Sequence, residues 1–292
     1  MPTAIVDQRQ SVPAPDRLRP ACREAVSITG RPYVSHSQLS TMRQCPRRFS
    51  FQYIERARLD FQPSSLLFGG AMHAAFESWY RGRLEGITAT PADLFDAFMD
   101  RWKLDRAGVG GDVPVKFCKG EDMGTITALA RRMIDAFLAA PISRPNGRIL
   151  GIEEQFSVVL APDLPDIVAR VDLVTETAEA LHVVDLKTAR SRWTEERAAE
   201  AGEQLLLYGR VTRDLARGAG LPTKLHFAVI TKAKVPQVQV IDVLADQGRL
   251  SAVRDSVAQV WTAARGGNYF ANPSPLNCSN CPFKSRCPAF AG

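Results

Sequence analysis

The run Val183-Val-Asp-Leu-Lys-Thr188 places a carboxylate, Asp185, two residues before an ammonium group, Lys187. On a strand, residues two apart point to the same side of the sheet, so the two charges are expected to share one apolar environment. Burying them is costly unless a metal or a reacting anion accepts them. A second acid, Asp172, lies thirteen residues earlier in another apolar run. Two interpretations follow: a half-buried structural ion pair, or the centre of metal-assisted phosphodiester hydrolysis.

Further polar residues fall on neighbouring predicted elements. His73 lies on a predicted helix and can offer one imidazole nitrogen to a metal, although a lone histidine is more often a core residue. Glu153 stands at the start of a predicted strand, and its neighbour Glu154 is expected to face the opposite side. Gln204 and Tyr208 are four residues apart on a later predicted helix, so both can reach one groove.

Four of the six cysteines form a pattern. Cys278-x2-Cys281-x5-Cys287 lies near the C-terminal end, and Cys45 lies far away in a similar Cys-Pro context. Close thiols in a cytoplasmic protein favour a metal over disulfides. Four thiolates fit either tetrahedral zinc or a [4Fe–4S] cluster, and the spacing leaves both open. Either metal would clip the C-terminal tail onto the first helix and stabilise the fold.

A basic segment with interleaved aromatic residues lies between Arg43 and Arg58. Guanidinium groups beside aromatic rings suit single-stranded nucleic acid, and the net charge of +6 mildly favours a polyanionic partner. The alternative is a basic amphipathic helix whose aromatic residues belong to the core. The arginines are Arg43, Arg47, Arg48, Arg56 and Arg58, and the aromatic residues are Phe49, Phe51 and Tyr53.

The elements that must position these residues alternate between helical and strand-like patterns. The order predicts an α/β protein with a central mixed sheet flanked by helices, in which the first three strands form a meander. Helices are expected at 35–56, around 73–80, and at 91–107, 124–140, 195–215 and 246–265. Strands are expected at 149–160, 166–175, 180–187, 223–231 and 236–243.

The chain is long enough for one large domain. Residues 1–32 lack periodicity and are expected to be a loosely ordered tail, with one domain over 33–290. Within that domain, 85–145 is interpreted as a helical insert and 268–290 as the cysteine-rich tail. No apolar run reaches the length of a membrane span and no signal peptide is recognised, so a cytoplasmic location is expected.

Taken in order, these motifs resemble those of the PD-(D/E)xK nuclease superfamily, specifically RecB-type exonucleases with an iron–sulfur cluster. The resemblance spans residues 33–290. The chain is similar to the nuclease modules of helicase–nuclease repair complexes and to CRISPR-associated adaptation nucleases. The matching motifs are Gly-Gly-Ala-Met-His73, Glu153-x-x-Phe156, Arg170-Val-Asp172, Asp185-Leu-Lys187-Thr188, Gln204-x-x-x-Tyr208, and Ser37-x-Leu39 leading to Cys45-Pro46 and the cysteine tail.

The resemblance implies a restriction-endonuclease-like core and a role for each residue. His73, Asp172, Asp185 and the backbone carbonyl of Leu186 are expected to hold Mg²⁺ or Mn²⁺. Lys187 is expected to orient or deprotonate the attacking water and to stabilise charge, rather than to pair with Asp185. The remaining roles are Glu153 as an outer-shell residue or ligand of a second metal, Gln204, Tyr208, Arg47 and Arg48 as DNA contacts, and Cys45, Cys278, Cys281 and Cys287 as ligands of a structural [4Fe–4S] cluster rather than zinc.

The function expected from the resemblance is a metal-dependent DNA nuclease, an exonuclease favouring single-stranded DNA or DNA ends, in repair or recombination. The alternative is a catalytically inactive DNA-binding or scaffolding subunit of a helicase–nuclease complex. The retained charges of Asp172, Asp185 and Lys187 weigh against it. The chain has no Gly-rich phosphate loop ending in Lys-Ser/Thr, so any helicase is expected to be a separate subunit.

Overall fold

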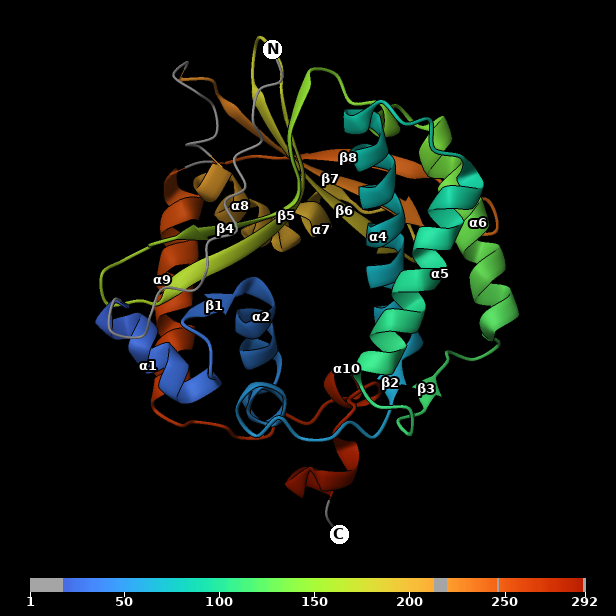
Figure 1. Cartoon of the computed structure of the whole chain (residues 1–292). Coiled ribbons are helices and arrows are strands. Elements are labelled where there is room, and N and C mark those ends of the chain that lie inside the picture. The colour runs from blue at the N-terminus through green and yellow to red at the C-terminus, as the bar shows by residue number, and fades with distance from the viewer. Residues whose placement is uncertain (1–17, 213–219, 246, 291–292) are drawn as a thin grey trace.

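The centre of the molecule is a six-stranded mixed sheet (Figure 1). The computed structural model describes residues 18–212, 220–245 and 247–290. β4, β5 and β6 form the predicted antiparallel meander, β6 and β7 are parallel, and β7 and β8 are antiparallel, which confirms the predicted fold class. The strands are β1 (Tyr33–Ser35), β4 (Arg148–Val158), β5 (Asp166–Glu176), β6 (Leu181–Ala189), β7 (Thr223–Thr231) and β8 (Val238–Val243).

One face of the sheet is covered by the long helices α4 (Ser64–Glu85), α5 (Pro91–Gly108) and α6 (Met123–Ala139), which stand together in Figure 1. Local signals set the ends of these helices. Gly86, with φ of 72°, caps the end of α4 in the left-handed conformation that glycine tolerates. Thr90 forms a capping box at the start of α5. Buried aromatic rings, among them Phe76, Phe98 and Phe137, then fill the space between helices and sheet.

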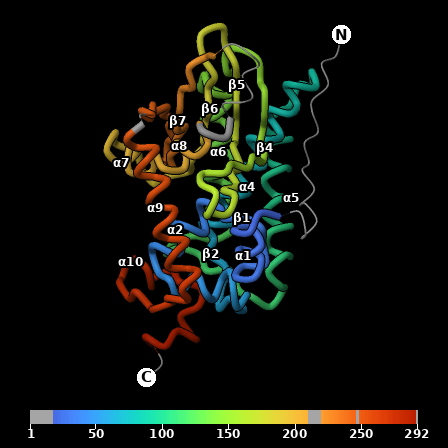
Figure 2. Tube along the Cα trace, turned by 90° about the vertical axis from the view of Figure 1, so that its left-hand side faces the viewer, coloured from blue at the N-terminus to red at the C-terminus, as the bar shows by residue number. Residues whose placement is uncertain are grey.

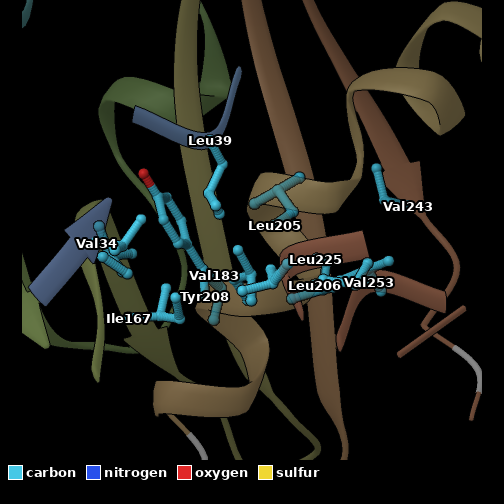
Figure 3. Close-up of a cluster of buried hydrophobic side chains, with 14 of the residues drawn as sticks. Val34, Leu39, Ile167, Val183, Leu205, Leu206, Tyr208, Leu225, Val243 and Val253 are labelled. Carbon is cyan, nitrogen blue, oxygen red and sulfur yellow. The ribbon is translucent and has the colours of Figure 1, made fainter. Parts of the chain in front are cut away.

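The other face packs against α2 (His36–Gln44), α8 (Glu203–Thr212) and α9 (Gln247–Arg265). Figure 3 shows the ring of Tyr208 lying among Val34, Ile167 and Val183 in this second core. Successive strand residues serve the two cores in turn, since Val183 lies in this core and Val184 in the one beneath α4. A short helix, α7 (Glu195–Ala201), precedes α8 and takes the first part of the helix predicted over 195–215; residues 213–215 lie outside the described ranges.

Two expectations for the N-terminal part are wrong. Within the segment expected to be a loose tail, α1 (Pro20–Thr29) is a helix with proline in its first turn and Gly30 as a left-handed cap. Arg19 ties it to the sheet through a hydrogen bond from Nε to Asp166 Oδ1 (3.1 Å). The helix predicted over 35–56 is interrupted at Cys45, which is extended because a proline follows it. Beyond it lie α3 (Pro46–Phe49) and a π-helical turn, η2 (Ser50–Ile54).

The C-terminal tail is irregular, as predicted, apart from short turns. These turns are α10 (Pro275–Cys278), η5 (Lys284–Arg286) and η6 (Pro288–Phe290). α9 leads the chain from α7 and α8 down to α10 at the far end of the molecule (Figure 2). There the tail contacts the N-terminal part: Asn277 Nδ2 donates to the carbonyl of Gln44 (2.9 Å), and the N–H of Arg47 donates to the carbonyl of Phe270 (3.0 Å).

Three short elements remain among the described residues. β2 (Gln62–Pro63) and β3 (Val115–Lys116) form a short parallel pair that the sequence did not predict, and η3 (Pro141–Ser143) follows α6. Among the described residues, no helix is both long and apolar enough to cross a membrane.

Candidate active site

The strand register aligns three acids across the meander. Leu173 pairs with Val184, so Asp172 on β5 stands opposite Asp185 on β6. Glu153 on β4 falls opposite Asp172, between the pairs formed by its neighbours Ile152 and Glu154. The acids therefore form a row across three adjacent strands, although they are far apart in the sequence.

The strands are irregular where this row crosses them. In β5, Val171 and Val174 both lie in the core beneath α8, whereas Leu173 lies in the core beneath α4. Side chains two residues apart normally share a face of the sheet, so the regular alternation of side chains between the two faces is broken beside Asp172. In β4, Glu153 has a φ of 50°, a left-handed conformation that costs a residue other than glycine about 1–3 kcal/mol. Strain of this kind is concentrated at functional sites, because the surrounding structure must hold it in place.

Three side chains from this region gather around one point. The His73 Nδ1 atom, on α4, lies 3.2 Å from Asp172 Oδ1 and 3.3 Å from Glu153 Oε1. The three potential ligand atoms all lie within 4.8 Å of one another, and the residues line a pocket of about 220 Å³. Two carboxylates and one imidazole are suitable ligands for Mg²⁺ or Mn²⁺. We call His73, Glu153 and Asp172 the acid–histidine group.

Asp185 and Lys187 lie beside this group and contact each other. Lys187 Nζ is 2.6 Å from Asp185 Oδ2 and also donates to Gln204 Oε1 (2.9 Å). The expectation that the two residues do not pair is therefore wrong. The Gln204 side-chain amide donates in turn to the Tyr208 hydroxyl, which joins four of the predicted residues in one chain of contacts. Among the described residues, it is Glu153 rather than Asp185 that completes the group with His73 and Asp172.

The backbone of β6 also contributes. The N–H of Leu186 donates to Asp172 Oδ2 (2.6 Å), which fixes the Asp172 carboxylate from the side opposite His73. The predicted ligand from Leu186 is its carbonyl oxygen, and that role stays a prediction.

Comparison with known families decides the identity of this arrangement. A sequence profile of the PD-(D/E)XK nuclease superfamily matches residues 33–288, which include every residue of the site. The chain belongs to the PD-(D/E)XK nuclease superfamily. A solved structure from Eubacterium rectale, provisionally named an exonuclease, has a TM-score of 0.52 and 14% identity over 89% of each chain. At that identity the likeness shows the fold alone.

Other comparisons add little to the superfamily assignment. The crystal structure of SSO0001 has a TM-score of 0.34 and 14% identity over 80% of this chain and 88% of the other, and no argument rests on it. No curated protein matches the sequence.

Burial and charge shift the proton affinities of this PD-(D/E)XK site in opposite directions. Burial lowers the pKa of His73, but the negative charges of Asp172 and Glu153 outweigh the effect of burial and raise this pKa to about 10. Burial would raise the pKa of Asp172, but His73 and Lys187 hold it below its usual range. For Asp185, burial and repulsion from Asp172 outweigh the attraction of Lys187, and together they raise the pKa to about 6.

Lys187 keeps its charge despite its burial. Burial lowers its pKa, but Asp185 and Asp172 together raise it above the ordinary value. In this arrangement Lys187 is an ammonium group that donates hydrogen bonds. An ammonium group can orient a water molecule, and the two predicted actions of Lys187 on water stay predictions.

Three residues near the PD-(D/E)XK site were missed by the sequence analysis. Arg170 Nε lies 2.6 Å from Glu153 Oε2, and its spacing of two from Asp172 on a predicted strand is a signal that could have found it. Arg101 of α5 lines the same pocket as the acid–histidine group. His36 is half-buried near Glu203 and Lys187, and desolvation, partly offset by Glu203, lowers its pKa to about 4. Only the packing of helices against the sheet places the last two.

The structure brings together the four predicted cysteine ligands. They line one small pocket where the tail meets η2. No three of these thiols have all their sulfur atoms within 4.8 Å of one another, as judged from the described residues. Tetrahedral zinc with Zn–S bonds of 2.3 Å would bring the sulfur atoms to about 3.8 Å from one another, and the choice between zinc and a cluster stays a prediction. The cysteines are Cys45, Cys278, Cys281 and Cys287.

Arg47 and Arg48 line the cysteine pocket, not the pocket of the acid–histidine group. Their Nε atoms are buried and have no hydrogen-bond partner within the described part of the chain. A buried donor without a partner is costly unless an acceptor is supplied. Sulfur atoms carrying negative charge would be such acceptors, so these residues fit an anionic metal–thiolate centre.

Proposed function

We propose that this chain is a metal-dependent DNA nuclease, an exonuclease that acts on single-stranded DNA or DNA ends. The observation that carries the proposal is the acid–histidine group, held in an open pocket beside a lysine and within a PD-(D/E)XK core. The preference for single strands or ends is part of the proposal and follows from the family resemblance.

In this proposal His73, Glu153 and Asp172 hold Mg²⁺ or Mn²⁺, and Asp185 and the Leu186 carbonyl remain predicted ligands. The same negative charge that keeps a proton on His73 favours a cation in its place. A bound divalent cation supplies Lewis acidity that withdraws electron density from a phosphoryl oxygen. The proposal is supported by the donor set, which combines hard oxygen atoms with one imidazole.

Lys187 orients the attacking water and stabilises negative charge that develops on the phosphate. Lys187 donates one hydrogen bond to Gln204 and forms an ion pair with Asp185, and an ammonium group has three N–H donors, so a further donor can reach an incoming oxygen. Tyr208 is 5% exposed, and it acts by fixing Gln204 rather than by stacking on a base. Gln204 then positions the Lys187 ammonium group, which makes the reacting geometry rigid.

The four cysteines are proposed to hold a structural [4Fe–4S] cluster. When bound, it supplies a cross-link between the tail and the helix that ends before Cys45. Arg47 and Arg48 would offset its charge through donors that are otherwise unsatisfied. Their predicted role as DNA contacts stays a prediction beside this one.

A role in repair or recombination, a separate helicase subunit and a cytoplasmic location complete the proposal. They follow from the family resemblance and the cysteine usage, and they stay predictions.

Cleavage of end-labelled single-stranded and double-stranded DNA, and of circular DNA that has no ends, with Mg²⁺ or Mn²⁺ tests the function. Lys187→Ala and Asp172→Asn should abolish cleavage while DNA binding survives. Asp135→Asn, an exposed acid on α6, is the matched control and should cleave normally. Cleavage at the wild-type rate by Lys187→Ala would refute the mechanism, and a wild-type protein that binds but never cleaves would favour the scaffolding alternative.

Anaerobic purification tests the cluster without reference to activity. The expected result is a brown protein containing about four iron and four sulfide per chain. A colourless folded protein containing one zinc would refute the assignment.

A further inference from the structure

The helical insert reaches into the pocket of the acid–histidine group through one residue. Arg101 on α5 lines this pocket together with His73, Glu153 and Asp172. α5 lies against α4, the helix that carries His73, and both cover the same face of the sheet (Figure 1). A cationic side chain from the insert thus stands beside the candidate metal-binding group.

Arg101 is held in place by its neighbours. Its Nε donates to Asp105 Oδ1 (2.8 Å), one turn further along α5. Asp105 in turn packs over Gly70 of α4, where an added Cβ would lie 3.1 Å from Asp105 Oδ2. Gly70 therefore allows α5 to bring this pair close to His73, which lies three residues further along α4.

The outer edge of the Arg101 guanidinium is left available. Within the described part of the chain, its two Nη groups make no hydrogen bond, and its side chain is 37% exposed. Arg170, the second guanidinium of the pocket, is also held through its Nε, but its partner is Glu153 of the acid–histidine group, and His73 contacts both acids of that group. Arg101 is thus a guanidinium of this pocket that can receive an external anion without giving up a contact with the acid–histidine group.

We propose that Arg101 binds a backbone phosphate of the DNA strand beside the acid–histidine group, so that the helical insert supplies a phosphate subsite. The inference rests on the proposed function. A guanidinium whose Nε is fixed presents its two Nη groups as a fork that matches two phosphate oxygens. Asp105 is a positioning residue, because it sets the direction of that fork.

The acids near Arg101 make phosphate binding at this subsite depend on a divalent cation. Glu153, Asp172 and Glu77 line the same pocket and repel an anion. A divalent cation between strand and acids would relieve that repulsion. Phosphate binding at Arg101 is therefore expected to be stronger with Mn²⁺ than with EDTA.

The test measures binding of a single-stranded oligonucleotide as a function of salt concentration, with every variant built on Lys187→Ala so that the DNA is not cleaved. Arg101→Gln should weaken binding about 10-fold at low salt. It should also reduce the slope of log K against log salt by about 0.7, the value for one lost phosphate contact on a single strand. Arg101→Lys should keep the slope and lose part of the affinity.

Arg132→Gln is the matched control, because Arg132 is exposed on α6 in the same insert and lies outside the pocket. It should leave affinity and slope unchanged. If Arg101→Gln binds with the affinity and slope of its parent, or if Arg132→Gln shows the same loss, the subsite is refuted.

A glycine pair tests the positioning step. Gly70→Ala should shift Asp105 by a few tenths of an ångström and weaken binding less than Arg101→Gln does, whereas Gly69→Ala, which meets no atom within 4 Å, should leave binding unchanged. Equal binding by both would overturn the role of Gly70 and Asp105. Because these measurements do not need cleavage, a protein that binds without cleaving would refute the nuclease proposal alone, and a cleaving protein insensitive to Arg101 would refute the subsite alone.

Discussion

Replacing Asp185 with asparagine removes a charge from the most buried position of the acid row. Asp185 is 1% exposed, faces Asp172 across the sheet and pairs with Lys187 at 2.6 Å. Loss of a buried ion pair destabilises many proteins by about 3–5 kcal/mol. For Asp185, burial and repulsion from the Asp172 carboxylate outweigh the attraction of Lys187, so the charged form of Asp185 is unfavourable in the folded protein.

The pKa of Asp185 gives the size and sign of the effect. It rises from 3.8 to about 6 on folding, and at 1.36 kcal/mol per pH unit this corresponds to about 3 kcal/mol. Between pH 4 and pH 6 the folded protein keeps the proton that the unfolded chain releases. The free energy of unfolding therefore falls over that range and stays lower above it. Asparagine cannot ionise, so Asp185→Asn should be about 3 kcal/mol more stable than the wild type at pH 8 and similar to it below pH 4.

Urea unfolding in EDTA at several pH values measures this difference directly. EDTA keeps divalent cations from compensating for the charge. Asp135→Asn, an exposed acid on α6, should change the free energy of unfolding by less than about 0.5 kcal/mol. Asp185→Asn that is less stable than the wild type at pH 8 would show that the Lys187 ion pair outweighs burial, and the reasoning would be refuted.

Three further predictions concern the site and the cysteine clip. Tyr208→Phe removes the hydroxyl that fixes Gln204, so kcat for cleavage should fall about 10-fold with KM unchanged; steady-state rates that match the wild type would contradict this role. Mn²⁺ should raise the melting temperature of the wild type but not of Glu153→Gln, and equal shifts in a thermal melt would exclude Glu153 as a ligand. Cys45→Ser should lose its colour and expose the tail to limited proteolysis, whereas Cys118→Ser, whose residue lies outside the cysteine pocket, should change neither.

The meander and the positions of its acids could be predicted because their signals are local. Apolar runs of strand length surround Asp172 and Asp185, and turn residues separate them. Placing Asp172, Asp185 and Glu153 on consecutive antiparallel strands requires only short connections, which the sequence displays. The helix carrying His73 was also predictable, although its distance from the acids was not.

The parts that could not be predicted depend on non-local contacts or on single backbone angles. Glu153 belongs with His73 because its strand is bent at a φ of 50°, and no pattern of residue types encodes that bend. Whether Lys187 turns to Asp185 or away from it depends on Gln204, which comes from another helix. Arg101 is an ordinary helix residue until α5 packs against α4.

The joining of the tail to the first helices has a consequence for the order of events during synthesis. Asn277 and its acceptor Gln44 are separated by 233 residues. At about 5–20 residues per second, a ribosome needs roughly 12–50 s to make the second partner after the first. The sheet and its row of acids lie between these positions and emerge earlier. The segment around Cys45 therefore stays without its final partners until synthesis is nearly finished, and a chain stopped before the tail carries its acids without the clip.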